Sequence, residues 1–261
     1  MGILLKNSSG AVGSIAAAGM SEVHYKDNTG NVSLVWSSGL RLSDMPVGAL
    51  IRFTVNNAPW NFLVVHQGKP SAMYDTSFDG GTILLMQNLY TPRVWHDSNM
   101  NSFSSSAIFF YVNGTFRNLI DANIRALIRQ VRIPYRPGTS GTTVNSGANG
   151  LPAYVWLLGG YEVNWTLIAT LPADGAPLSY FADMEQTDAR RIAYFNGTAT
   201  PWWLRSPNTT STNVYQINQN GGTNNTGAST YERGVRPAVV LPGTTLIDPA
   251  PNADGSYNII V

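Results

Sequence analysis

The stretch at 202–241, WWLRSPNTTSTNVYQINQNGGTNNTGASTYERGVRPAVVL, has rigid-looking ends and a soft middle. Its first end, WWLRSP, is bulky, and each large aromatic side chain there needs to bury on the order of 150–250 Å². Its last end, GVRPAVVL, is typical of a tight turn that leads into a buried strand. Between the ends, most positions are Asn, Thr, Ser or Gly. The pattern predicts a polar segment held by a well-packed frame.

The middle of this stretch would resemble a disordered linker if composition were the only guide. The ends argue otherwise, and VYQIN at 214–218 alternates like a short strand. Arg205 is expected to donate to buried backbone carbonyls, because its fork of N–H groups suits that task. Four side chains are expected to be buried in the frame: Trp202, Trp203, Leu204 and Val239.

A polar tract over about 208–231 is therefore predicted to be a displayed surface on a rigid frame, which is how binding loops are built. Tyr gives such a surface rigid contact area, and Ser, Asn and Gly adapt their hydrogen bonds. The expected ligand-contacting residues are Asn208, Thr209, Thr210, Ser211, Thr212, Asn213, Tyr215, Asn218, Asn220, Asn224, Asn225, Thr230 and Tyr231.

Composition narrows the range of partners. The 261 residues are 43% hydrophobic and 12% charged, with a formal net charge of +1. Nucleic acids and anionic membranes require concentrated Lys and Arg, which this chain does not have. No apolar run reaches the length of a membrane span. Cysteine is absent, which excludes disulfides, thiolate catalysis and sulfur-ligated zinc. Sugars, peptides and protein surfaces remain as partners.

The chain is predicted to have two parts. Within residues 1–40, VHYK and VSLVW flank DNTGN at 27–31, which indicates a hairpin. This part is expected to be a small β module for attachment or oligomerisation, and the alternative is a hairpin that packs on the main domain. Residues 41–261 are expected to form the ligand-binding domain.

The main domain has the pattern of an α+β fold, with short strands, one or two helices and long irregular loops. Strands are predicted at 50–55, 60–66, 82–86 and 131–133. Apolar residues at spacings of three and four predict a helix over 115–130, preceded by a shorter helix at 104–112. The Gly/Ser/Thr-rich segment 137–150 is predicted to be a loop.

The sequence gives little indication of a catalytic site. The chain has no GxSxG, HExxH, P-loop or GxGxxG pattern. His96 and its neighbour Asp97 are the most reactive-looking pair, and Glu162 is a further acid. An enzyme that uses His96, Asp97 or Glu162 is kept as an alternative, whereas the leading expectation is a protein that is not an enzyme and binds no cofactor and no metal.

Five segments carry a family resemblance: VVHQGKPSAMYD, FRNLIDANIRALIRQVRIPYR, SGANGL, WWLRSP and GVRPAVVLP. In this order they cover the chain from about Gly48 to Leu241. They resemble a phage-associated family of uncharacterised domains that looks like the formylglycine-generating-enzyme variety of the C-type lectin fold. Some members of that family resemble the variable proteins of diversity-generating retroelements, in which adenine-directed mutagenesis rewrites codons near the C-terminus.

The resemblance implies a ligand-display or receptor-binding protein of a phage tail, located in the virion, or in the bacterial host cell if a bacterium encodes it. Asn codons mutated at adenine give Tyr, Ser, Thr, Asp, Gly and Ile but never a stop, which fits the composition of the tract. The implied partner is a protein or glycan on a cell surface, bound by a homo-oligomer, possibly a trimer. A structural tail protein with merely solvating loops is a further alternative.

Two properties of related proteins are not implied. The enzymes that give the fold its name depend on cysteines, and this chain has none. Many C-type lectins bind calcium through clustered acidic and amide side chains. Here Glu232, directly after the tract, is the only acid and there is no Asp, so calcium-dependent sugar binding is not expected.

Overall fold

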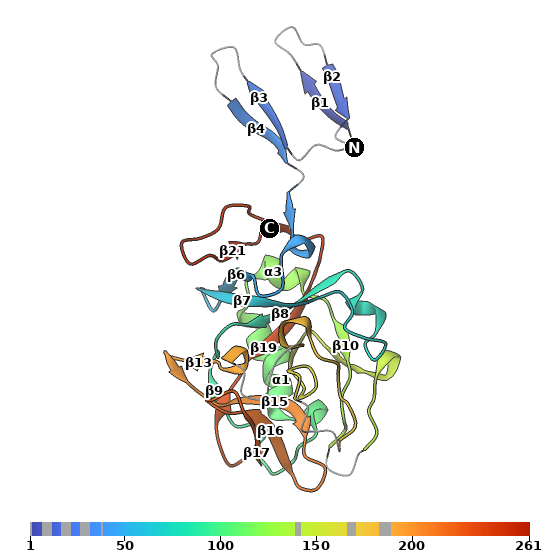
Figure 1. Ribbon diagram of the computed structural model, residues 1–261, viewed down its shortest axis with the longest axis vertical. Helices are drawn as coiled ribbons and strands as arrows, with labels where there is room; N and C mark the ends of the chain where they lie inside the picture. The colour runs from blue at the N-terminus through green and yellow to red at the C-terminus, as the bar shows by residue number, and fades with distance from the viewer. Residues whose placement is uncertain are drawn as a thin grey trace. The chain divides into compact units, whose positions relative to one another are not determined.

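The computed structural model describes residues 2–6, 12–16, 22–26, 32–37, 39–138, 142–165, 171–182 and 189–261. The chain divides into two compact units, Met1–Leu40 and Arg41–Val261 (Figure 1).

The first unit contains two antiparallel strand pairs. β1 (Gly2–Lys6) pairs with β2 (Val12–Ala16), and β3 (Glu22–Lys26) pairs with β4 (Val32–Ser37). The strands of the predicted hairpin are confirmed as β3 and β4, while its turn at 27–31 lies outside the described residues. The β1–β2 pair was not predicted, because its sequence is rich in Gly, Ser and Ala.

The second unit is built on a six-stranded sheet in the order β12-β19-β8-β7-β6-β21. The neighbours are antiparallel except β21 and β6, which are parallel. The strands are β12 (Val155–Leu157), β19 (Pro237–Pro242), β8 (Gly81–Met86), β7 (Ala58–Gln67), β6 (Leu50–Val55) and β21 (Tyr257–Asn258). Every residue of β8 is buried, which explains its run of four apolar residues at 83–86.

The turn between β6 and β7 shows how sequence sets the register. Asn56 and Asn57 both have positive φ, at 50° and 59°, and Asn tolerates this left-handed region better than most residues. Two such residues suit a two-residue hairpin turn whose twist matches that of the strands. Val55 therefore faces Ala58, and Phe53 faces Trp60.

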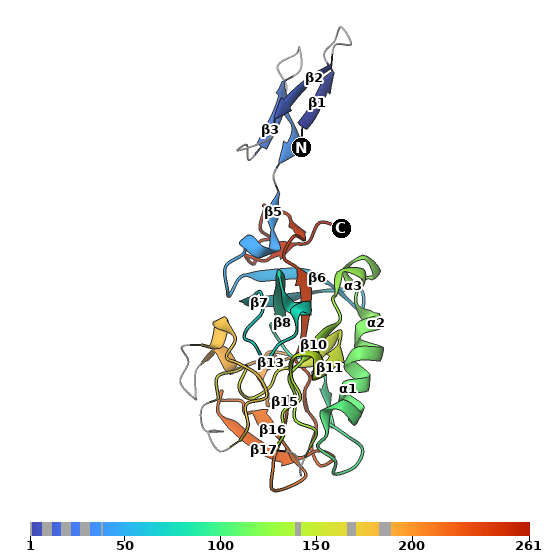
Figure 2. The same ribbon diagram turned by 90° about the vertical axis from the view of Figure 1, so that its right-hand side faces the viewer.

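A second, five-stranded sheet has the order β17-β16-β15-β18-β9. It consists of β17 (Thr223–Gly227), β16 (Asn213–Ile217), β15 (Trp202–Pro207), β18 (Arg233–Gly234) and β9 (Pro92–Arg93). Both views place β16 and β17 at the end of this unit opposite to β6 and β7 (Figures 1 and 2). The predicted burial of the frame is confirmed, since four side chains are 0% exposed: Trp202, Trp203, Leu204 and Val239.

The predicted helix over 115–130 is correct only in part. A π-helical turn at Val112–Phe116 follows α1 (Ala107–Tyr111), and two short helices come after it, α2 (Arg117–Leu119) and α3 (Ala122–Leu127). Ile120 is extended between α2 and α3, because it bridges to Val55 at the edge of the sheet. Tertiary pairing thus overrides the helical periodicity. Figure 2 shows α1, α2 and α3 along one side of the unit.

The remaining elements are short. They include β5 (Leu40–Arg41), β10 (Val131–Ile133), β11 (Leu151–Ala153), β13 (Tyr194–Phe195), β14 (Thr198–Ala199), β20 (Leu246–Ile247) and 3-10 turns such as η7 (Ser179–Phe181) and η8 (Ala189–Arg191). The chain is a mixed α+β protein made mostly of strands, as predicted. Over the described ranges, no helix is both long and apolar enough to cross a membrane.

Candidate functional site

The polar tract lies on the surface of the second unit. All of the expected contact residues are half-buried or exposed, and Tyr231 is 51% exposed. They occupy the β15–β16 connection (208–212), β16, the β16–β17 turn, β17 and the loop before β18. The apolar residues of the same stretch, Val214, Ile217 and Ala228, are 0% exposed. The chain therefore sends these apolar side chains inward and leaves most of the polar ones accessible, with Gln216 as a buried exception.

One face of the β16–β17 ribbon carries an aromatic ring and several amides. The register sets Tyr215 opposite Asn225, and Nδ2 of Asn213 donates to Oδ1 of Asn225 at 2.8 Å. The Tyr215 ring packs edge-on against Trp165, with 4.6 Å between ring centroids. Nδ2 of Asn208 donates to the Tyr215 hydroxyl at 3.4 Å. Burial raises the pKa of Tyr215, so its hydroxyl stays neutral at physiological pH.

The opposite face is organised by Arg233. Its Nε donates to Oε1 of the buried Gln216 at 2.6 Å, and Nε2 of Gln216 donates to Oδ1 of Asn218 at 3.1 Å. The Arg233 guanidinium lies 4.8 Å from the centroid of the Tyr231 ring. The exposed tract side chains thus lie on both faces of the ribbon and in its loops, and not on one flat face.

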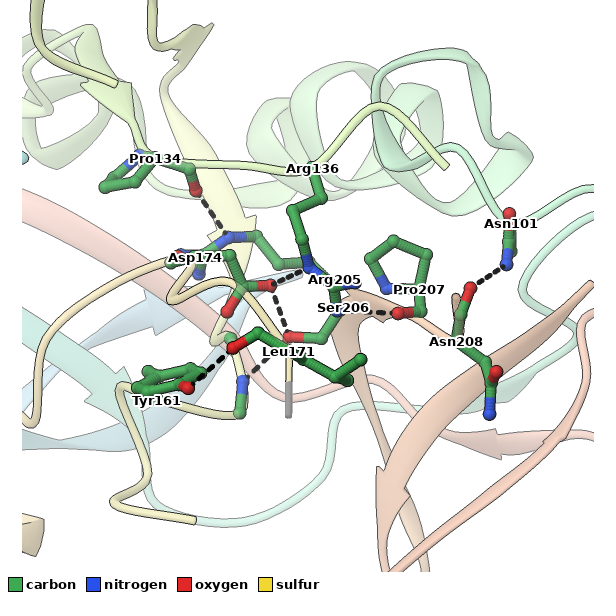
Figure 3. A network of polar contacts seen from close by, with 12 residues as sticks. Asn101, Pro134, Arg136, Tyr161, Leu171, Asp174, Arg205, Ser206, Pro207 and Asn208 are labelled. Carbon is green, nitrogen blue, oxygen red and sulfur yellow. Dashed lines mark hydrogen bonds and ion pairs between the residues drawn. The ribbon is translucent and has the colours of Figure 1, made fainter. Parts of the chain in front are cut away.

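The backbone of the tract is held by a buried side chain from outside it. Asn101 is 2% exposed, and its Nδ2 lies within 3.0–3.1 Å of the carbonyl oxygens of Asn208, Ser211 and Asn213. Figure 3 shows the contact between Asn101 and Asn208. These bonds go to main-chain oxygens, which every residue type provides. Changing the side chains at these positions therefore leaves the acceptors in place.

A second anchor holds the last residue of β15. Nη2 of Arg136, which is 1% exposed, donates to the carbonyl of Pro207 at 2.6 Å. Nε of Arg136 lies 3.9 Å from Oδ2 of the buried Asp174, and that same oxygen accepts from Oγ of Ser206 at 2.6 Å (Figure 3). The tract therefore begins at a chain segment fixed by charged and polar groups.

Arg205 is the centre of the buried network beneath the tract. Its predicted bonds to backbone carbonyls are confirmed, at Pro134 (3.0 Å), Leu157 (3.1 Å) and Asp174 (2.5 Å). Sequence reasoning missed its main partner, Glu162, whose carboxylate receives Nη1 at 2.5 Å and Nη2 at 3.1 Å. These two residues are 43 positions apart in the sequence, and no local pattern links them.

The protonation states of this network follow from its partners. Burial lowers the pKa of Arg205, but the carboxylates of Glu162 and Asp174 raise it more in total, so the guanidinium stays charged. The Tyr74 hydroxyl donates to Oε1 of Glu162 at 2.7 Å. Burial, followed by the charge of Glu162, raises the pKa of Tyr74 well above its ordinary value. The group is a buried scaffold in which Arg205 bonds to Glu162 and Tyr74 donates to the same carboxylate.

Glu162 lies in different surroundings from His96 and Asp97, the other residues of the enzymatic alternative. Glu162 is 1% exposed and bonded to Arg205 and Tyr74. His96 is half-buried on a loop, where its Nδ1 accepts from the backbone N–H of the exposed Asp97 at 2.9 Å. Among the described residues, no hydrogen bond or ion pair joins Glu162 to that loop. Within the described ranges, no cluster of three or more His, Cys, Asp or Glu side chains has the arrangement of a metal site.

The loop that carries His96 borders the tract, which sequence reasoning missed. The backbone N–H groups of Trp95 and His96 both donate to the carbonyl of Ala228, at 3.0 and 3.1 Å. Oγ of Ser229 donates to Oδ1 of the exposed Asn99 at 2.8 Å. The run of polar residues after Trp95 was the only feature of the sequence that could have indicated this loop. This loop adds fixed polar groups to the edge of the tract.

Comparison with known proteins identifies a family for this architecture. Residues 79–243 match a family described as a domain of unknown function, DUF6273. The chain belongs to the DUF6273 family. No curated protein and no solved structure matches the chain.

The DUF6273 region contains most of the candidate site, although Tyr74 lies outside it. It includes the tract at 208–231, the anchors Asn101 and Arg136, and the Glu162–Arg205 pair, whereas the first unit lies outside it. The tract and most of its supporting network therefore belong to one family domain.

Proposed function

We propose that this DUF6273 domain displays the tract at 208–231 as a ligand-binding surface. The proposal rests on the observation that residues outside the tract hold its backbone, while residues within it form the exposed surface. Asn101 holds the tract through its backbone and Arg136 holds the residue before it, while the expected contact side chains are half-buried or exposed. A binding surface whose backbone is held from outside can keep its frame when its own side chains change, and so can change specificity without refolding.

The proposed ligand is a protein or a glycan on a cell surface. The tract presents amides, hydroxyls and the rings of Tyr215 and Tyr231, and these groups suit polar, uncharged partners. The tract itself has no charged residue, and Glu232 and Arg233 follow it directly, beside the fixed loop with Asp97. In this proposal the protein acts by binding and not by catalysis, and the buried Glu162 serves the scaffold.

The finer fold assignment is also a proposal. We infer a C-type lectin-like fold of the formylglycine-generating-enzyme variety from the sequence resemblance and from the mixed α+β architecture. In that setting the tract is the segment that a diversity-generating retroelement rewrites. The test is the surrounding DNA: a near-copy of the tract codons that differs at adenines, beside a reverse transcriptase gene, is expected. Codons without such a copy would leave a binding surface that is not diversified.

The proposed setting is a phage tail, so that the protein is part of the virion, or a bacterial cell if the gene is bacterial. A polar face with few aromatic or Arg anchors binds weakly at each site, because those anchors dominate tight interfaces. Linked copies raise overall avidity by about 10²–10⁴ without new contacts. The first unit, with its two strand pairs, is proposed to join the copies into a homo-oligomer, possibly a trimer.

Binding of the labelled protein to a panel of intact bacterial cells tests the proposal. The tract variant replaces the exposed residues Thr210, Thr212, Thr230 and Tyr231 with Ala. The matched control replaces four exposed residues of the same unit with Ala: Thr54, Asn123, Gln130 and Thr244. We expect the tract variant to lose cell binding at least tenfold and the control to retain it, with both melting like the parent. Equal binding by parent and tract variant would reject the proposal.

A further inference from the structure

A small pocket lies outside the tract. Its volume is about 300 Å³, and the residues that matter most in its lining are Gln87, Asn88, Tyr180, Arg190, Tyr194 and Arg236. They come from the end of β8, from η7 and η8, from β13 and from the residue before β19. Among the described residues, two arginines and no acidic residue line it. None of its lining residues belongs to the expected ligand-contacting set.

Arg236 contributes an incompletely bonded charge to this pocket. It is 1% exposed, and its Nε and Nη2 donate to the carbonyls of Met86 (2.9 Å) and Gln87 (3.0 Å). Within the described part of the chain, its Nη1 has no hydrogen-bond partner and no carboxylate forms an ion pair with it. Two other buried arginines do face acids, since Arg205 pairs with Glu162 and Arg136 lies near Asp174.

A buried charge without a counter-ion is costly, and a guanidinium matches the geometry of a carboxylate. We propose that this pocket binds a small organic monocarboxylate that carries hydroxyl groups, such as a sugar acid. One uncompensated guanidinium calls for one negative charge. The volume is at the lower end of the range of small-molecule sites, which begins at about 300 Å³.

The rest of the lining suits a hydroxylated ligand. The amides of Gln87 and Asn88 and the hydroxyl of Tyr194 can donate to and accept from ligand hydroxyls. Arg190 lies 5.5 Å from the centroid of the Tyr180 ring and adds positive charge at an exposed edge. Nη1 of Arg236 is covered in the free protein, so binding requires a rim side chain such as the exposed Asn88 or Tyr194 to turn aside.

Isothermal titration of the full chain with glucuronate tests the proposal, with glucose and inorganic phosphate as comparison ligands. We expect glucuronate to bind and the other two to give no measurable heat. Arg236→Gln removes the charge. Ala189→Trp fills the pocket from an exposed position, so it serves as the second test if Arg236→Gln does not fold. Each folded variant should weaken glucuronate binding at least tenfold.

Two controls separate this site from the tract. Arg41→Gln removes an exposed arginine elsewhere, and the tract variant described above alters the other surface. Both should bind glucuronate like the parent. Absence of glucuronate binding, equal binding of glucose or phosphate, or unchanged affinity in Ala189→Trp would overturn the proposal. So would loss of glucuronate binding in the tract variant, because the ligand would then sit on the tract.

Discussion

At the scale of single residues, Asn101 is the main side chain that holds the backbone of the tract. One buried amide contacts three main-chain carbonyls of the tract, although it has only two hydrogens to share among them. Sequence reasoning did not single out Asn101, because it is one Asn among many and its partners lie more than 100 positions away. Arg205 was easier to predict, since an arginine that follows Trp202, Trp203 and Leu204 in a buried strand has to bond to something internal.

Replacing Asn101 with Ala should destabilise the protein by about 1–3 kcal/mol, because it leaves buried carbonyls without donors. Denaturant unfolding measures this difference. Asn123→Ala, at an exposed position, is the control and should stay within about ±0.5 kcal/mol of the parent. Equal stability of the two variants would mean that Asn101 does not hold the tract.

His66 gives stability a defined dependence on pH. Its Nδ1 accepts from the backbone N–H of Ser179 at 3.1 Å and lies 2.8 Å from its Oγ. Burial lowers the pKa of His66, against smaller opposing effects of the Lys69 backbone and Glu162. The folded state therefore holds the extra proton less tightly than the unfolded state. This contribution is present above the unfolded pKa of about 6.5 and is lost as pH falls through the folded value.

Unfolding experiments at pH 8 and pH 5 should thus show a loss of stability at low pH that is smaller in His66→Gln than in the parent. His96→Gln controls for the effect of removing a histidine elsewhere. If His66→Gln and the parent lose the same stability between the two pH values, His66 contributes nothing to the dependence.

At the scale of elements, hydrophobic patterning located most strands but not their partners. β6 was predicted with its bounds, because a clear apolar alternation ends at two Asn residues. β17 was missed, since TNNTG has no apolar residue and becomes a strand only by pairing with β16. The prediction of one helix over 115–130 was wrong at Ile120 for a related reason, because Val55, its partner on the sheet, is distant in sequence. Non-local pairing is what the sequence could not reveal.

The frame strand β15 supports a direct prediction. Trp203 is 0% exposed, and its Nε1 donates to the carbonyl of Arg93 at 2.8 Å. Trp203→Ala should cost about 3–5 kcal/mol, because it removes a large buried side chain and leaves a cavity. Thermal and denaturant unfolding measure the loss. A variant that melts like the parent would show that β15 is not the rigid base of the tract.

At the scale of the whole molecule, the exposure of the tract was predictable from composition and from the apolar ends. The fixed loop after Trp95 was not, because only the fold brings it to the tract. The buried anchors were hidden for the same reason. The first unit poses a separate question, since its strand pairs are small and its proposed role is assembly.

Light scattering should show that the full chain is a homo-oligomer and that a shortened chain beginning at Leu40 is a monomer. A two-stranded pair is marginal alone, so the four strands of the first unit are expected to gain stability by association. A monomer in both cases would exclude the proposed assembly. An oligomer that buries residues 208–225 would contradict the role of the tract.

Randomisation of the tract tests the central claim most directly. One library varies the expected contact residues with Asn101 and the rest of the chain unchanged. A second library varies the exposed control positions Thr54, Asn123, Gln130 and Thr244. Both are displayed on cells, scored for protease resistance and selected for binding to lysozyme. We predict that most tract variants stay folded and that lysozyme binders arise from the tract library alone. Widespread unfolding of the tract library, or equal numbers of binders from both libraries, would contradict a displayed binding surface.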